Sequence, residues 1–159
     1  MAYWWRRCWQ RTGESKLIKI TETTPQDVEQ IQEWLDADPW HRDEVRNDPN
    51  FMVTGQGLQS FCVQDEKGPV FFIRFDAEGE LVRVAIQFPP ESLVSRQRIA
   101  LGLKYGAVSA VKIFGTKHGF KGAVFESVNP ELIAFMNRFG FESAGNNDYV
   151  LRFEGQQDV

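Results

Sequence analysis

The sequence predicts an α/β protein in which one central mixed sheet carries helices on both faces. Three consecutive segments rich in Val, Ile and Phe are separated by short turn sequences, a pattern typical of antiparallel strands joined by hairpins. Segments with helical periodicity precede and follow this meander, and further strand-like segments alternate with them. The sequence contains no internal repeat, so this order of elements indicates a single sheet domain.

Composition agrees with one compact domain. Of 159 residues, 42% are hydrophobic and 25% charged, and the two cysteines, Cys8 and Cys62, are too few for a disulfide framework. A net charge of −4 argues against general nucleic-acid binding, and no apolar stretch reaches the roughly 18 residues of a membrane helix. We expect a cytoplasmic protein with one domain over residues 17–155 and a Trp- and Arg-rich extension over residues 1–16.

The domain is expected to begin with a strand and a helix. Leu17–Thr21 has the composition of a short strand. Thr24 followed by Pro25 is typical of a helix start, and apolar residues at helical spacing then predict an amphipathic helix that ends near Asp38. Residues 39–58 contain Gly and Pro and are expected to form a short helix and loops at the border of a substrate pocket.

The meander follows this region. Its three predicted strands share a high content of β-branched and aromatic residues and are Ser60–Gln64, Val70–Phe75 and Leu81–Phe88. The sequences at 66–68 and 76–79 are good hairpin turns. Pro89 and Pro90 end the third strand, because proline cannot extend a sheet ladder.

A long helix is predicted from about Val94 to Lys117. His118 and Gly119 close it, since a cation and a glycine are both favoured at the C-terminal end of a helix. The remaining elements are a strand, a helix that begins with an Asn-Pro-Glu sequence, and a hairpin of two strands: Ala123–Val128, Asn129–Gly140, Phe141–Ala144 and Tyr149–Phe153.

Positive charge is concentrated around the long helix. From Ser92 to Phe125 the sequence has six cations and no acid. Such a stretch can hold an anionic ligand by Coulomb attraction, or it can be a helix whose lysines face water. The six cations do not form one stripe around a helix, so Arg96 and Arg98 are the pair that we consider as anion ligands.

From about Leu17 to Phe153, this order of elements resembles the fold of the GNAT-type N-acetyltransferases. In one motif, Asn129 opens a helix and Gly140-Phe141 closes it, with the spacing of that family. In a second feature, the strand sequence Ile86-Gln87-Phe88-Pro89 leads into a long helix, as it does in the family. The chain also resembles divergent GNAT-like proteins of phages, in which the family's motifs are likewise matched only in part.

The resemblance implies that acetyl-CoA lies between two parallel strands that splay apart, here 81–88 and 123–128. Backbone groups near Ile86 and Phe88 would bind the pantetheine arm, and free N–H groups at the start of the long helix would bind the pyrophosphate. An amine would then attack the thioester carbonyl. The cofactor-binding residues implied in this way are Ile86, Phe88, Arg96, Gln97, Arg98, Ala100, Gly102 and Asn129.

The pyrophosphate loop of the family is matched only in part. The most similar sequence is Gln97–Gly102, with Ala100 in the place of the first glycine. This sequence lies far enough along to be inside the helix, where N–H groups are already hydrogen-bonded. Alternatively, residues 93–96 form the turn, Arg96 and Arg98 supply the positive charge, and the glycines of the helix serve for packing. The sequence leaves both alternatives open.

For proton transfer, there are two candidate general bases: the resemblance implies Glu80, and Glu126 is a candidate because a carboxylate in a central strand must be paired or functional. Glu80 lies at about the position of a glutamate that the family often carries, and Glu126 lies in the following predicted strand. Met136 stands where the family often has a tyrosine that protonates the leaving thiolate, and a thioether cannot donate a proton. His41 and His118 have no third ligand near them in the sequence, so we expect no metal site.

The resemblance therefore implies an N-acetyltransferase that moves an acetyl group from acetyl-CoA to an amine of a small molecule or a protein. The alternative is a GNAT-like module that binds a partner without catalysis, or a phage-associated structural protein, and the missing glycine and tyrosine favour it. No residue identifies the acceptor. We expect no nucleic-acid or membrane partner, and a homodimer is among the oligomeric states that the sequence allows.

Overall fold

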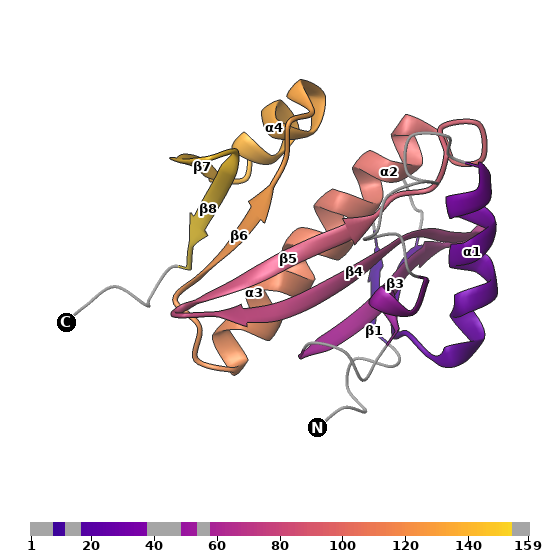
Figure 1. Ribbon diagram of the computed structural model, residues 1–159, viewed down its shortest axis with the longest axis horizontal. Coiled ribbons are helices and arrows are strands. Elements are labelled where there is room, and N and C mark those ends of the chain that lie inside the picture. Colours follow the sequence, from indigo (N-terminus) through magenta and orange to yellow (C-terminus); the bar gives the residue numbers. More distant parts are fainter. Residues whose placement is uncertain (1–7, 12–16, 38–48, 54–57, 154–159) are drawn as a thin grey trace.

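The computed structural model describes residues 8–11, 17–37, 49–53 and 58–153, which form one mixed sheet with helices on both faces (Figure 1). The strands are β1 (Cys8–Arg11), β2 (Leu17–Glu22), β3 (Gln59–Asp65), β4 (Gly68–Glu78), β5 (Leu81–Gln87), β6 (Gly122–Glu126), β7 (Glu142–Gly145) and β8 (Asp148–Arg152). The helices are η2 (Pro25–Asp27), α1 (Val28–Ala37), η3 (Pro49–Met52), α2 (Arg96–Gly102), η4 (Leu103–Ala107), α3 (Val108–Lys117) and α4 (Pro130–Asn137).

The sheet has the strand order β1-β2-β3-β4-β5-β6-β8-β7. Among the described strands, β5 and β6 are the one parallel pair, and all other neighbours are antiparallel. The connection from β5 to β6 contains the long helical segment, because parallel neighbours need a crossover. The predicted mixed sheet is confirmed, and the meander and the last hairpin lie where the sequence analysis expects them.

Each face of the sheet has its own apolar core. On one face, α2, η4, α3 and α4 cover side chains such as Phe71, Ile73 and Phe75 of β4. On the other, α1 and η3 cover Phe72 of β4 and Cys62 of β3. Successive β4 side chains thus point to opposite faces, which explains why the strand reads as an unbroken apolar run.

Strand β1 comes from within the segment 1–16 that the sequence analysis treats as an extension. Cys8–Arg11 pairs antiparallel with β2 and forms an edge of the sheet. The rest of that segment, and His41 with most of the region 39–58, lie outside the described residues. Within that region, Pro49–Met52 forms the short helix η3.

The predicted long helix is helical from Arg96 to Lys117, with one π-helical stretch, η4, in its middle. Two glycines let this helix lie close to the sheet. A Cβ atom at Gly102 would lie 2.9 Å from a ring carbon of Phe71, and one at Gly106 would lie 2.7 Å from Cγ1 of Val63. Both distances are shorter than normal carbon contacts, so side chains at these positions would push the helix away from the sheet.

Candidate functional site

Strands β5 and β6 separate part-way along their length. Their parallel pairing ends with Arg83 opposite Val124. Beyond that point, β5 stays paired with β4 up to Gln87, but its other edge has no strand partner among the described residues. Figure 1 shows the two strands diverging from their paired end. The backbone of 84–87 therefore offers an open strand edge, to which an extended ligand can hydrogen-bond.

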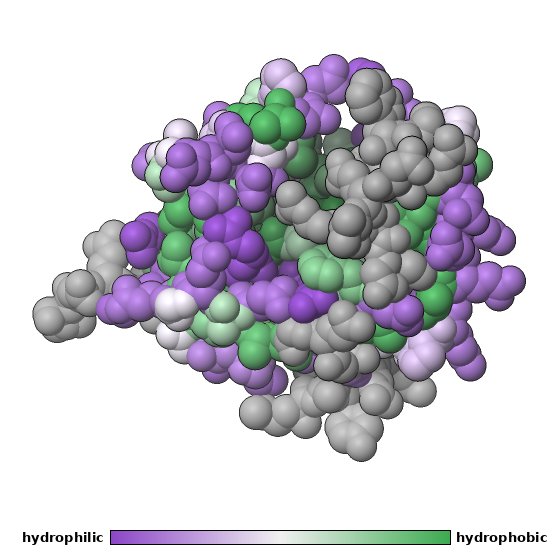
Figure 2. Space-filling view, viewed as in Figure 1, coloured by the Kyte–Doolittle hydropathy of each residue, from purple (hydrophilic) through white to green (hydrophobic). Residues whose placement is uncertain are grey.

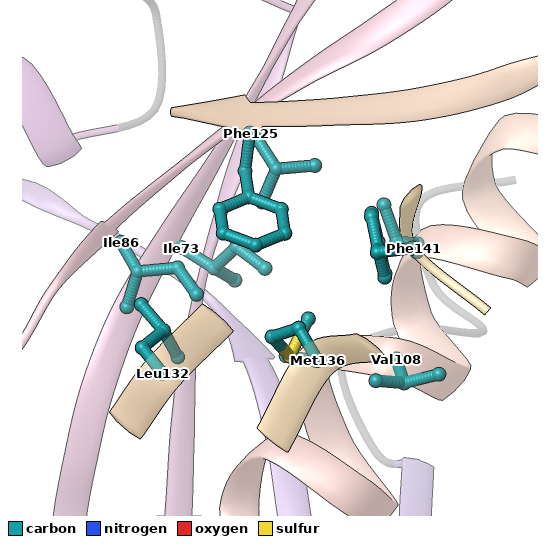
Figure 3. Close-up of a pocket in the computed structure, with 10 residues that line it drawn as sticks. Ile73, Ile86, Val108, Phe125, Leu132, Met136 and Phe141 are labelled. Carbon is teal, nitrogen blue, oxygen red and sulfur yellow. The ribbon is translucent and has the colours of Figure 1, made fainter. Parts of the chain in front are cut away.

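An apolar cavity of about 20 Å³ lies where the strands diverge, between the long helix and α4 (Figure 3). Its lining side chains come from the sheet, both helices and the residue that precedes β7, and are Ile73, Val84, Ile86, Ala107, Val108, Val111, Phe125, Leu132, Met136 and Phe141. A cavity of this volume holds about one water molecule. An elongated ligand would therefore enter only if α4 or its side chains Leu132 and Met136 moved outward.

We call the space between β5 and β6 beyond Arg83 and Val124 the wedge. Two helices begin at its open end. After β5, Ser95 caps α2, and its Oγ accepts a hydrogen bond from the N–H of Arg98 at 3.3 Å. After β6, Asn129 caps α4, and its Oδ1 accepts hydrogen bonds from the N–H groups of Glu131 at 2.9 Å and Leu132 at 3.3 Å. The Asn-Pro-Glu sequence thus acts as a helix start, as predicted. Within the described residues, the amide NH₂ group of Asn129 has no hydrogen-bond acceptor.

The structure places the Gln97–Gly102 sequence inside the helix, as the second alternative for the pyrophosphate turn requires, but Arg96 is helical as well and Arg98 is paired with Asp65. The sequence Gln97–Gly102 is helical, and Ala100 lies in the second helical turn. Gly102 is buried against Phe71 and Val70 of the sheet, so it serves for packing and not for the approach of a ligand. The turn before the helix therefore lies at residues 91–95.

The two arginines near the helix start have different surroundings. Arg98 makes two hydrogen bonds to Asp65, with Nε 2.6 Å from Oδ2 and Nη2 2.8 Å from Oδ1, and the side chains are only 14% and 9% exposed. Arg98 thus joins the helix to the β3–β4 turn, and to act as the predicted anion ligand it would have to leave Asp65. Arg96 is 74% exposed, and its Nη1 lies 3.3 Å from Oε2 of Glu131. Of the pair, Arg96 is the one at the open end of the wedge.

The ion pair with Arg98 also lowers the pKa of Asp65. Burial raises the pKa of the Asp65 carboxyl, but hydrogen bonds from the Arg98 guanidinium and from the N–H of Lys67 outweigh burial. The net result is an Asp65 pKa below its ordinary value. The ion pair is therefore maintained at neutral pH.

The structure places Glu80 at the paired end of β5. It lies in the turn before β5, with Oε1 3.4 Å from Nζ of Lys121, the residue before β6. This is the end where β5 and β6 are hydrogen-bonded together. The start of the open edge is four residues away, about 13 Å at the rise of an extended strand. Glu80 as the base stays a prediction, and this position beside the paired end of the strands does not favour it.

Glu126 lies at the open end instead. It is the last residue of β6 and is exposed, and its side chain makes no hydrogen bond or ion pair within the described residues. Because Phe125 lines the cavity, the alternation of side chains directs Glu126 to the opposite face of the sheet. Glu126 thus lies at the open end of β6, on the face of the sheet opposite the cavity.

Sequence analysis missed a charged network on that same face. Arg83 of β5 donates hydrogen bonds to Asp148 of β8 at 3.0 and 3.2 Å and to Glu78 of β4 at 2.7 and 2.9 Å. The hydrogen bond from Arg83 lowers the pKa of the Asp148 carboxyl. Asp148 is the cross-strand neighbour of Glu126, so the network fixes the strand beside the candidate base. Figure 2 shows hydrophilic residues over β5, β6 and β8 on this face.

Other predicted residues have clear structural surroundings. Met136 is 5% exposed and forms part of the cavity wall, and it has no proton to donate. The ring of Phe88 packs edge-on against Phe71, with centroids 5.8 Å apart. His118 follows α3 as its C-cap, and the centroid of its ring lies 4.3 Å from that of Phe114.

In the described residues, no three His, Cys, Asp or Glu side chains are grouped so as to hold a metal ion, and no helix has both the length and the apolarity to cross a membrane.

No family model and no curated protein matches the sequence, but solved structures match the fold. An acetyltransferase of the GNAT family from Staphylococcus aureus superposes with a TM-score of 0.64 at 12% identity, covering 86% of this chain and 99% of that chain. The ribosomal-protein-S18-alanine N-acetyltransferase of Escherichia coli gives 0.61 at 15% identity, covering 86% and 94%. The chain has the GNAT fold.

A third structure with the GNAT fold contains the cofactor. It is a GNAT family acetyltransferase from Brucella melitensis in complex with acetyl-CoA, with a TM-score of 0.52 at 16% identity, covering 89% of this chain and 91% of that chain. The fold expected from the motifs at Asn129 and Ile86–Pro89 is confirmed. At identities this low, the structural superpositions establish the fold alone, and the activity has to be argued from the site.

Proposed function

We propose that this protein is an N-acetyltransferase that transfers an acetyl group from acetyl-CoA to an amine, and that it acts in the cytoplasm. The observation that carries the proposal is the loss of pairing between β5 and β6 after Arg83 and Val124. It exposes a strand edge beside an apolar cavity, and two helices begin at its open end. The GNAT fold, seen with acetyl-CoA in the Brucella melitensis structure, supports the same assignment.

The residues at the wedge fit the parts of acetyl-CoA. The open edge at 84–87, which includes Ile86, offers backbone groups for the amides of the pantetheine arm, and Phe88 follows directly after it. Arg96 and the N–H groups at the start of α2 suit the pyrophosphate, with Gln97 in the same helical turn. The apolar cavity suits the sulfur and acetyl end, once it widens.

The chain's own contribution to the chemistry is positioning and proton removal. Acetyl-CoA supplies an activated thioester carbonyl. The open edge of β5 holds it in place, and the apolar side chains around Met136 exclude water. We propose Glu126 as the group that accepts the proton of the amine, because it is the predicted carboxylate at the open end of β6. Met136 offers no proton to the leaving thiolate.

A binding module without catalysis is the second candidate. The observation that favours it is the narrow cavity, which Phe125, Met136 and neighbouring side chains leave at about 20 Å³. In that case the fold would remain, but the wedge would not admit the pantetheine arm. The two candidates therefore differ in whether acetyl-CoA binds at all.

Isothermal titration with acetyl-CoA separates them. We expect the wild type to bind and Leu132→Trp, which fills the wedge, to bind at least about tenfold more weakly. The control is Leu58→Trp, at an exposed residue outside the wedge, which should bind like the wild type. Circular dichroism checks that each variant is folded. Absence of wild-type binding at millimolar acetyl-CoA would refute the enzyme and leave the binding module.

Turnover on a panel of amines tests the base. We expect Glu126→Gln to lower kcat by about 10²-fold or more with little change in acetyl-CoA affinity. Glu80→Gln is the matched control, because the same substitution is made at the closed end of the strand pair. Equal rates for Glu126→Gln and the wild type would remove Glu126 from the proposal.

A further inference from the structure

We infer that Arg96 and Glu131 form a latch across the open end of the wedge, and that the diphosphate of acetyl-CoA opens it by taking Arg96 from Glu131. The inference rests on the proposed function, since it concerns how the cofactor enters. It assigns to Glu131 a role in cofactor affinity that does not follow from the fold.

The latch joins the two sides of the wedge. Arg96 is the first residue of α2, which follows β5, and Glu131 lies in the first turn of α4, which follows β6. Arg96 Nη1 lies 3.3 Å from one carboxylate oxygen of Glu131 and 3.4 Å from the other. Because β5 and β6 diverge below these helix starts, the ion pair spans the gap between them.

The latch lies beside the side chains that keep the cavity narrow. Leu132, next to Glu131 in α4, lines the cavity, and Met136 lines it one turn further on. An outward movement of the first turn of α4 that admits a pantetheine arm would carry the backbone of Glu131 away from Arg96. When the cavity opens through this movement, the ion pair is weakened at the same time.

Arg96 is held only by exposed carboxylates, so a ligand of higher charge can replace them. Arg96 Nη2 also lies 3.8 Å from Oε1 of Glu91, so one cation is shared by two carboxylates. The side chains of Arg96 and Glu131 are both exposed, so their ion pair is easily exchanged. A diphosphate carries more charge than a carboxylate and accepts the two parallel hydrogen bonds that a guanidinium offers. Until the exchange takes place, Glu131 competes with the cofactor for Arg96.

Removal of the competing carboxylate tests the latch. We expect Glu131→Gln to bind acetyl-CoA about threefold to tenfold more tightly at low salt, mainly through faster association, and the gain to shrink in 0.5 M salt, where the Debye length is only a few ångströms. Titration calorimetry and stopped-flow fluorescence measure the two effects. Glu142→Gln, the same substitution at an exposed residue of β7, should bind like the wild type.

The double variant distinguishes a latch from general repulsion. In the Arg96→Gln background there is no cation to release, so Glu131→Gln should change the affinity by less than about twofold. An equal gain in both backgrounds would overturn the latch and indicate through-space repulsion alone. Unchanged or weaker binding by Glu131→Gln, with normal wild-type binding, would overturn the latch and leave the proposed function standing. A wild type that fails to bind acetyl-CoA would instead refute the proposed function itself.

Discussion

Replacement of Arg98 tests whether this arginine holds the fold or the cofactor. In Arg98→Met, the carboxylate of Asp65 remains, 9% exposed, without its guanidinium partner. Loss of one partner of a buried ion pair costs about 3–5 kcal/mol, and we expect the lower end, about 3 kcal/mol, because neither side chain is fully buried. At this chain length that corresponds to a fall in Tm of roughly 6–12 °C.

Urea unfolding followed by tryptophan fluorescence measures this loss. The control is the double variant Arg98→Met with Asp65→Leu, which removes both charges and should recover about half of the lost free energy of unfolding or more. Both variants should bind acetyl-CoA within about twofold of the wild type, since Arg98 is held by Asp65. Arg96→Met should do the reverse, with little change in stability and weaker binding.

One pattern of results would refute this reasoning. If Arg98→Met kept the wild-type free energy of unfolding to within about 0.5 kcal/mol and lost its affinity for acetyl-CoA, the pair with Asp65 would not be structural. Arg98 would then have to leave Asp65 when the cofactor binds, as the sequence-based expectation of an anion ligand requires.

Three further predictions follow from single contacts. The pKa values of Asp65 and Asp148 are lower in the folded chain than in the unfolded one, so the stability that the two carboxylates give is present above the unfolded pKa of about 3.9 and is lost as the pH falls through the folded pKa values. The urea concentration at the midpoint of unfolding, measured between pH 7 and 2, reports this loss. A midpoint concentration that does not fall below pH 4 contradicts the prediction. Gly106→Ala places a Cβ atom 2.7 Å from Val63 and should destabilise the fold by about 1–3 kcal/mol in thermal melts, whereas an unchanged Tm would show that the helix shifts freely. Asn129→Ala removes the cap of α4 and should cost about 1 kcal/mol in urea unfolding, with Asn129→Ser retaining most of it; equal losses in the two variants would argue against the cap.

Local patterns made most of the fold predictable. The end of β5 follows from Pro89 and Pro90, and the start of α4 follows from Asn129 and Pro130, because these residues act on their own backbone. Strand β1 was missed for the opposite reason. Cys8–Arg11 has no alternation of its own, and its strand conformation depends on pairing with β2.

The site was less predictable, because its residues depend on partners that are distant in the chain. Arg98 reads as a free cation until Asp65, 33 residues earlier, is seen beside it. Arg83 reads as an interruption of an apolar strand until the register brings Asp148 of β8 next to it. The resemblance placed Glu80 near the chemistry, but only the pairing register shows which end of β5 is open.

The narrow wedge does not by itself decide between enzyme and binding module. A protein whose binding-competent state is a minor fraction still binds, with an affinity reduced by that fraction. Widening the cavity separates Leu132 and Met136 from the sheet, and the pantetheine arm replaces the lost apolar contacts when it enters. If the wedge opens in this way, removal of the Glu131 carboxylate raises the open fraction and leaves Arg96 available, so binding tightens. If the rings of Phe125 and Phe141 close the wedge permanently, no substitution at the starts of α2 and α4 can tighten the binding of acetyl-CoA. A gain of affinity in Glu131→Gln would therefore be evidence that the wedge is a working cofactor site.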